Sequence, residues 1–220
     1  MTAVLVPAQP LFVPAEPSSP SSTTTQDVDT TESTTTIVIG SGFSGLAMAA
    51  ELNRQGIKAI VVEGIGQSTA AAPSPSTGGI SLDALAERTE IMRLLEHYAR
   101  RHELDIRPAT CAINLLRTPG DESRAQCQWS VETPTGTLLA HSIVFTRGAL
   151  NQLRRMLRNL GVSTGHDFTA AMHALGLYLV GVGEMILPTT QEILHQAKRA
   201  GQSISARAAL REITGGAVIA

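Results

Sequence analysis

The chain has 220 residues, of which 43% are hydrophobic, so it is long enough for one substantial core but short for two full domains. Its formal net charge of −2 excludes the broad positive field that draws proteins onto nucleic acid or anionic lipid. We therefore expect a small-molecule partner, with no nucleic-acid or membrane contact. The two cysteines fit no metal or redox spacing, so no metal site is predicted and a cytoplasmic location is expected.

The two ends of the chain differ in composition from its middle. Residues 1 to 34 are rich in Pro, Ser and Thr and contain no Lys or Arg. Such a segment buries too little apolar surface to offset its ordering entropy, which predicts a disordered tail. Residues 205 to 220 are expected to form a second, C-terminal tail. One domain is thus predicted over residues 35 to 204.

The domain begins with a strand, a helix and a second strand. The continuous apolar run at residues 37 to 39 is typical of a buried parallel strand. A helix is predicted over residues 43 to 55, with Gly56 at the left-handed position that often ends helices. The β-branched run at residues 58 to 63 predicts the second strand. Together these segments form one βαβ unit.

The rest of the domain predicts a mixed arrangement after a long loop over residues 64 to 80. A helix is expected over residues 81 to 101, followed by three strands over 110 to 118, 126 to 133 and 137 to 146. A short helix over 151 to 160, a strand over 177 to 183 and a closing helix over 190 to 204 complete the domain. The three consecutive strands are separated by turns containing Pro and Gly, which predicts a β-meander over residues 110 to 146. The fold class expected is therefore α/β: a Rossmann-like βαβ unit in a parallel sheet, plus a β-meander.

A glycine motif lies between the first strand and its helix, and reads Gly40-Ser41-Gly42-Phe43-Ser44-Gly45. In this pattern Gly40 permits a tight turn, Gly42 lets the backbone approach a diphosphate, and Gly45 lets helix and strand pack closely. Glu63 ends the next strand, where an acidic side chain accepts hydrogen bonds from ribose hydroxyls and repels a 2′-phosphate. Since strand, helix and acid are in register, the motif indicates a site for FAD or NAD and not merely a glycine-rich turn.

Four stretches resemble the FAD-binding domain of flavin-dependent monooxygenases of the flavin-containing and Baeyer–Villiger types, and more broadly of two-dinucleotide flavoprotein oxidoreductases. They are residues 37 to 63, 91 to 115, 129 to 150 and 176 to 204. This resemblance implies FAD as the cofactor. By transfer of matching positions it implies contacts from the motif residues and Glu63, from the backbone of Ala112 near the adenine, and from Gly148 and Gly181 near the diphosphate and ribityl chain.

The chain departs from these relatives where their second nucleotide domain, for NADPH, would be inserted. Only residues 149 to 175 occupy that place, and a βαβ unit alone needs roughly 30 residues. The resemblance therefore implies an FAD module without an NADPH domain. NADH or NADPH would act as a transient reductant, or a partner protein would supply the reductant or the substrate site. No set of catalytic side chains is identified.

The expected function is that of an FAD-binding oxidoreductase of the monooxygenase-like superfamily, and we lean towards an enzyme. One alternative is a non-catalytic FAD-binding scaffold or regulatory protein, or a degenerate remnant of a flavoprotein. Another is a simple NAD-dependent dehydrogenase, which the predicted β-meander disfavours because a plain dinucleotide fold has no such element.

Overall fold

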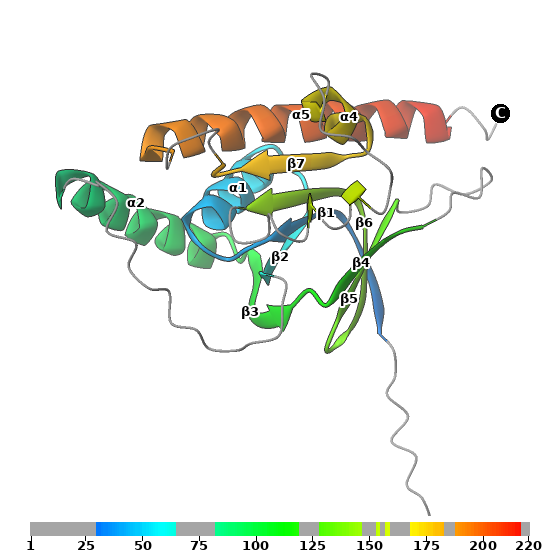
Figure 1. Ribbon diagram of the computed structural model, residues 1–220, viewed down its shortest axis with the longest axis horizontal. Helices are drawn as coiled ribbons and strands as arrows, with labels where there is room; N and C mark the ends of the chain where they lie inside the picture. The colour runs from blue at the N-terminus through cyan, green and yellow to red at the C-terminus, as the bar shows by residue number, and fades with distance from the viewer. Residues whose placement is uncertain are drawn as a thin grey trace, which may run out of the picture.

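The computed structural model describes residues 30–64, 82–118, 128–146, 153–154, 157–158, 168–182 and 188–216. Within these residues the chain forms seven strands in one sheet, with helices on both faces (Figure 1). The strands are β1 (Thr31–Ile39), β2 (Ala59–Glu63), β3 (Asp105–Cys111), β4 (Asn114–Arg117), β5 (Trp129–Thr133), β6 (Gly136–Thr146) and β7 (Leu177–Val180). The helices are α1 (Phe43–Arg54), α2 (Leu82–Arg101), α4 (Phe168–Ala174) and α5 (Thr190–Gly216).

The sheet has the strand order β3-β2-β1-β6-β5-β4, and β7 also pairs with β6. Strand β6 has two partners on one edge: its first half pairs antiparallel with β5, and its second half pairs parallel with β7. Strands β3, β2, β1 and β6 are parallel neighbours. The predicted α/β class with a parallel sheet and an attached meander is confirmed. The carboxyl ends of the parallel strands consequently lie at one edge, where such sheets bind ligands.

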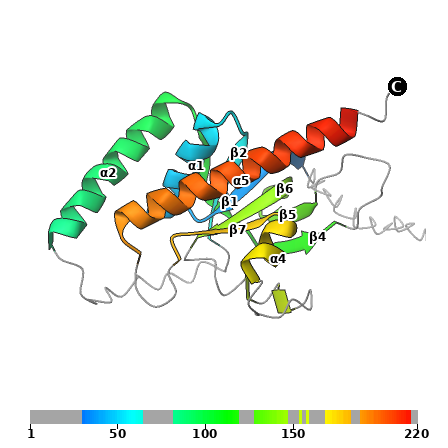
Figure 2. The ribbon, with the colours of Figure 1, turned by 90° about the horizontal axis from the view of Figure 1, so that it is seen from above.

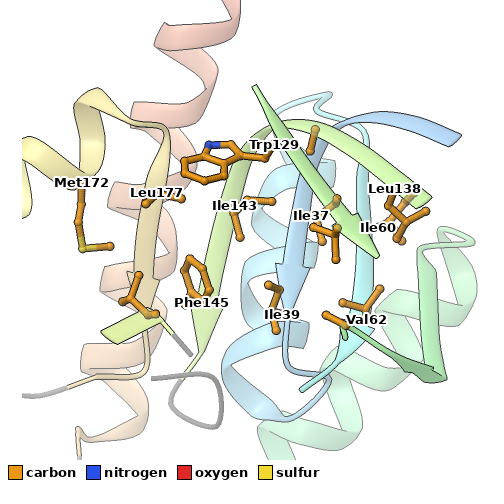
Figure 3. Close-up of a cluster of buried hydrophobic side chains, with 14 of the residues drawn as sticks. Ile37, Ile39, Ile60, Val62, Trp129, Leu138, Ile143, Phe145, Met172 and Leu177 are labelled. Atoms are coloured by element: carbon orange, nitrogen blue, oxygen red, sulfur yellow. The ribbon is translucent and has the colours of Figure 1, made fainter. Parts of the chain in front are cut away.

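The second half of β1 is buried on both faces, which explains its continuous apolar run. Ile37 and Ile39 belong to the cluster in Figure 3, which includes Trp129, Phe145 and side chains from α4. Val38 points to the opposite face and packs in a second cluster with residues of α1 and α5. Figure 2 shows α5 lying along the sheet on the side of α1, with α4 across β7 from it. Each face therefore has its own apolar core.

Helix α1 ends as the sequence predicts. Gly56 has a φ of +73°, and its N–H donates to the Asn53 carbonyl at 2.9 Å. The N–H of Ile57 donates to the Leu52 carbonyl at 3.0 Å, which completes a Schellman motif. This close return of the chain sends it directly into β2, so that β2 lies beside β1.

Regular structure extends beyond both predicted limits of the domain. Residues 31 to 34, assigned to the N-terminal tail, form the start of β1 and pair with β6 from Thr137 to Ala140. The backbone ladder holds this polar stretch, because strand pairing needs no apolar side chains. At the other end, residues 205 to 216 continue α5 and do not begin a tail. They are rich in Ala, Arg, Leu and Glu, all strong helix formers. Residues 1 to 29 and 217 to 220 lie outside the described residues.

The predicted start of the β-meander at residue 110 is also wrong. Thr110 and Cys111 end β3, which pairs parallel with β2, and the meander begins only at β4. The chain turns at Ala112, which is fully buried. Of the helix predicted over 151 to 160, residues 153, 154, 157 and 158 are helical and the others lie outside the described residues, as does most of the predicted loop over 64 to 80. Helix α4 was not predicted.

Candidate functional site

The glycine motif crosses the carboxyl edge of the sheet between β1 and α1. Gly40 has a φ of +116°, which favours glycine, and a Cβ built on it would come 3.1 Å from the Thr146 Cβ. Thr146, at the end of β6, donates its hydroxyl to the Ile39 carbonyl at 2.9 Å. A Cβ on Gly45 would come 2.9 Å from the Gly40 carbonyl carbon. The first and third glycines of the motif are therefore required by the turn and by the packing of α1 on β1.

Gly42, the second glycine of the motif, has room for a side chain. A Cβ on Gly42 would meet nothing within 4 Å among the described residues. Its backbone is extended, with a φ of −74° and a ψ of −168°, which other residues adopt without strain. The fold therefore does not require glycine here. A ligand that approaches the backbone closely does require it.

The N-terminus of α1 has backbone N–H donors that no described residue accepts a hydrogen bond from. The first helical hydrogen bond is from the Leu46 N–H to the Gly42 carbonyl, at 3.0 Å, so the N–H groups of Phe43, Ser44 and Gly45 precede the helical ladder. Gly42 makes no side-chain cap, and the first turn has no acidic residue. These donors and the positive end of the helix dipole suit an anion.

The N-terminus of α5 shows the contrast within the same molecule. There the Glu192 N–H donates to Thr189 Oγ1 at 3.2 Å, and the Thr189 N–H donates to Glu192 Oε2 at 2.7 Å. This capping box satisfies donors of α5 internally. Helix α1 has no such cap, so the two helix ends differ in what they leave for a ligand.

The end of β2 brings together the two residues expected near the adenosine. Glu63 is exposed and pairs with Cys111 across an irregularity in the register between β2 and β3. Ala112, the expected backbone contact of the adenine, follows directly. Glu63 and Ala112 therefore lie on neighbouring strand ends, at the edge where Gly40 leaves β1.

Gly181 lies at the end of β7 beside α1, with a φ of +77°. A Cβ on it would come 2.8 Å from the Ser44 Cβ. Its N–H donates to Gln196 Oε1 at 2.7 Å, and Gln196 Nε2 donates to the Val182 carbonyl at 3.0 Å. Gly181 thus lies beside the motif, and a side chain of α5 already uses its amide. Gly148, the other expected contact of the diphosphate, lies outside the described residues.

Two residues at this edge were not predicted. Gln196 has no local sequence signal, since its partners come from β7. Helix periodicity alone places Arg88 of α2 on the solvent face, yet its guanidinium carbon lies 5.1 Å from the centre of the Phe43 ring. Such a contact is a cation–π interaction. The positions of both residues at this edge depend on tertiary packing, so the sequence alone does not predict them.

Two clefts among the described residues lie away from this edge. The larger, of about 440 Å³, is where β1, β2 and β3 begin, and Ser33, Lys58 and Asp105 are among its lining residues. The smaller, of about 230 Å³, lies between α1, α2 and α5. Neither is lined by the motif or by Glu63. We place the site at the motif because backbone donors, and not an enclosed cavity, make a diphosphate cradle.

The residues present fit a dinucleotide: an open glycine, an uncapped helix end and an acid at the next strand end lie at one edge of the sheet. Among the described residues no group of three or more His, Cys, Asp or Glu side chains is arranged to hold a metal ion. Likewise, none of the described helices has the length and apolar character needed to span a bilayer.

Comparison with known proteins agrees with this description. Residues 35–84 match the family model of the FAD binding domain, which supports FAD as the cofactor. No curated protein matches the chain in sequence. The crystal structure of THI4 from Thermovibrio ammonificans is similar, with a TM-score of 0.53 and 13% identity over 80% of this chain and 90% of that one. This likeness shows the fold, a Rossmann-like FAD-binding fold.

Partial likenesses extend to larger proteins. A thioredoxin reductase from Gloeobacter violaceus matches 52% of this chain with a TM-score of 0.34 and 16% identity. Cyclohexanone monooxygenase matches 54% with a TM-score of 0.35 and 20% identity. The matches span only 36% of the reductase and 26% of the monooxygenase.

Proposed function

We propose that this chain is the FAD-binding module of an oxidoreductase of the monooxygenase-like superfamily. The observation that carries the proposal is the open, uncapped N-terminus of α1 behind Gly42, within the segment that matches the FAD binding domain. The sequence resemblance over four stretches supports the monooxygenase-like subtype.

The residues at the edge have separate roles in this proposal. The N–H groups of Phe43, Ser44 and Gly45 hold the diphosphate, and Ser41 and Gly42 let it approach. Glu63 accepts hydrogen bonds from the adenosine ribose, beside the backbone of Ala112. Thr146 keeps the loop in shape through its bond to the Ile39 carbonyl. Gly181 lets the end of β7 pass close to α1.

FAD, when bound, supplies the chemistry: it accepts a hydride and passes electrons to oxygen or another acceptor. The protein binds and orients it. Because no second nucleotide domain is recognisable in the sequence, we propose that NADH or NADPH binds only transiently, or that a partner protein supplies the reductant or the substrate site. The enzyme class is therefore proposed at the level of a flavin-dependent oxidoreductase.

The test is the absorption spectrum of the purified chain, from about 300 to 550 nm, with and without added FAD, followed by anaerobic addition of NADH or NADPH. The matched variants are Gly42→Val and Gly45→Val. Since a Cβ at residue 42 meets no atom of the described residues within 4 Å, Gly42→Val should fold normally and lose FAD affinity by at least about tenfold. Gly45→Val should fail to fold, because its Cβ would strike the Gly40 carbonyl.

Three outcomes separate the candidates. A chain that binds FAD and is reduced supports the oxidoreductase. A chain that binds FAD but is reduced by neither nucleotide favours the scaffold or a partner-dependent enzyme, and a second polypeptide that restores reduction distinguishes these two. A folded chain that cannot take up FAD overturns the proposal.

A further inference from the structure

We propose that Arg88 is a ligand of the diphosphate at the N-terminus of α1, with its guanidinium held in place by the Phe43 ring. The proposal rests on the proposed function, because it adds a side-chain cation to a cradle otherwise made of backbone. Neither the glycine motif nor the matched segment, residues 35–84, includes this residue.

The position of Phe43 fixes the position of the cation. Phe43 is the first residue of α1 and directly follows Gly42, and its side chain is only 6% exposed. The Arg88 guanidinium lies over this ring, 5.1 Å from its centre. A guanidinium that stacks on a ring keeps the N–H donors at its rim free for hydrogen bonds. Because this ring belongs to the first residue of α1, the proposal is that those donors reach the diphosphate held by the backbone N–H groups.

Two other arginines of α2 have a carboxylate partner, whereas Arg88 has none among the described residues. On α2, Arg93 pairs with Glu90 at 3.5 Å and Arg100 pairs with Glu96 at 3.8 Å. Among the described residues Arg88 has no acidic partner within ion-pair distance. The adjacent Glu87 accepts a hydrogen bond from Gln191 of α5 at 3.4 Å. The Arg88 charge is therefore held beside an aromatic ring and not neutralised by a carboxylate.

Two positive charges, the partial charge of the α1 N-terminus and the charge of Arg88, consequently lie at this edge. The N-terminus of α1 carries a partial positive charge, and its first turn has no acid to offset it. The Arg88 guanidinium adds a full positive charge next to it. An anion between them relieves the repulsion, and diphosphate matches guanidinium geometry through paired hydrogen bonds. The ligand chemistry that this arrangement recognises is a nucleoside diphosphate group.

The test compares binding constants of the full chain for FAD, ADP and adenosine, measured by calorimetry. Arg88→Leu should weaken FAD and ADP about tenfold, equivalent to ~1.4 kcal/mol, and leave adenosine unchanged. Arg88→Lys should fall between, because it keeps the charge but loses the paired donors. Arg93→Leu is the matched control: the same helix loses the same charge, and binding should not change. Affinity for ADP should also depend less on salt in Arg88→Leu.

The outcomes separate this inference from the proposed function. If Arg88→Leu keeps its helical content but binds FAD and ADP as the unchanged chain does, the inference is wrong and the FAD module stands. If adenosine weakens as much as ADP, Arg88 acts on the fold and not on the diphosphate, which also overturns the inference. If the unchanged chain binds neither FAD nor ADP, the proposed function fails and the inference fails with it.

Discussion

Gly181 and Ser44 meet where the end of β7 passes the first turn of α1, so closely that a Cβ on Gly181 would lie 2.8 Å from the Ser44 Cβ. This contact joins two segments far apart in the sequence. It sets the distance between β7 and the helix end that carries the proposed diphosphate donors. We therefore expect substitutions at this contact to change both the stability of the fold and the binding of FAD.

Gly181→Ala should destabilise the fold more than Gly56→Ala. Both glycines have nearly the same positive φ, +77° and +73°, so both substitutions carry a backbone strain of about 1–2 kcal/mol. Of the two, Gly181 alone has a neighbour in the way among the described residues, where a Cβ on Gly56 meets nothing within 4 Å. Urea unfolding of the two variants measures the difference, and FAD titration should show weaker binding in Gly181→Ala alone.

Ser44→Gly supplies the control for that comparison. Removing the Ser44 Cβ should relieve the contact, so the double variant should lose less stability than the sum of the two single variants, by roughly 0.5–3 kcal/mol. Additive losses would mean that Gly181→Ala acts through its φ alone.

Gln196→Leu should weaken FAD binding and lower the free energy of unfolding by about 1–2 kcal/mol. The change leaves the Gly181 N–H and the Val182 carbonyl without the hydrogen bonds that Gln196 makes to both. Gln202→Leu, at an exposed position of the same helix, is the control for added apolar surface. Equal behaviour of the two variants in urea unfolding and FAD titration would show that the Gln196 bridge has no role.

Removal of the Thr36 hydroxyl should have the opposite effect on the free energy of unfolding. Thr36 is fully buried in β1, and its Oγ1 has no hydrogen-bond partner in the part of the chain that the structure describes. Thr36→Val keeps the shape and removes an unsatisfied polar atom, so the free energy of unfolding should stay level or rise by about 1 kcal/mol. Thr146→Val makes the same chemical change where Oγ1 donates to the Ile39 carbonyl, and stability should fall by about 1 kcal/mol. A loss of stability in both variants would contradict the assignment for Thr36.

The βαβ unit could be predicted from the sequence because its signals are local. The apolar run before Gly40, the left-handed Gly56 and the acid at residue 63 each act within a few residues of the turn that they define. The start of β1 could not be predicted in this way. Residues 31 to 34 are polar, and their strand geometry comes from pairing with β6, about 100 residues further along the chain.

The candidate site likewise contains residues that the sequence predicts and residues that it does not. The glycines of the motif predict the turn, the close packing of helix on strand and the open position at residue 42, since each role depends on the missing side chain. Arg88 and Gln196 have no such signal, because each acts through a partner from another element: the Phe43 ring for Arg88, and the end of β7 for Gln196. Ordinary helix periodicity places Arg88 in solvent, and only the packing of α2 against α1 brings it to the cradle.

The last prediction concerns the dependence of stability on pH. Burial lowers the pKa of His141 below its usual value of 6.5, and the nearby Arg211 and Arg207 lower it further. Burial likewise lowers the pKa of His173, assisted by Arg199. Both histidines therefore bind a proton less readily in the folded chain than in the unfolded chain. As the pH falls below about 6.5 the unfolded state takes up more protons, so the free energy of unfolding should decrease.

The double variant His141→Gln, His173→Gln isolates this effect. Above about pH 8 both side chains are neutral in either state, so the histidines add no slope there. Between about pH 6.5 and 5 the unchanged chain should lose stability faster than the variant, because carboxylates contribute equally to both. Urea unfolding at several pH values measures the two slopes. Parallel slopes over this range would mean that burial of His141 and His173 does not disfavour their charged forms.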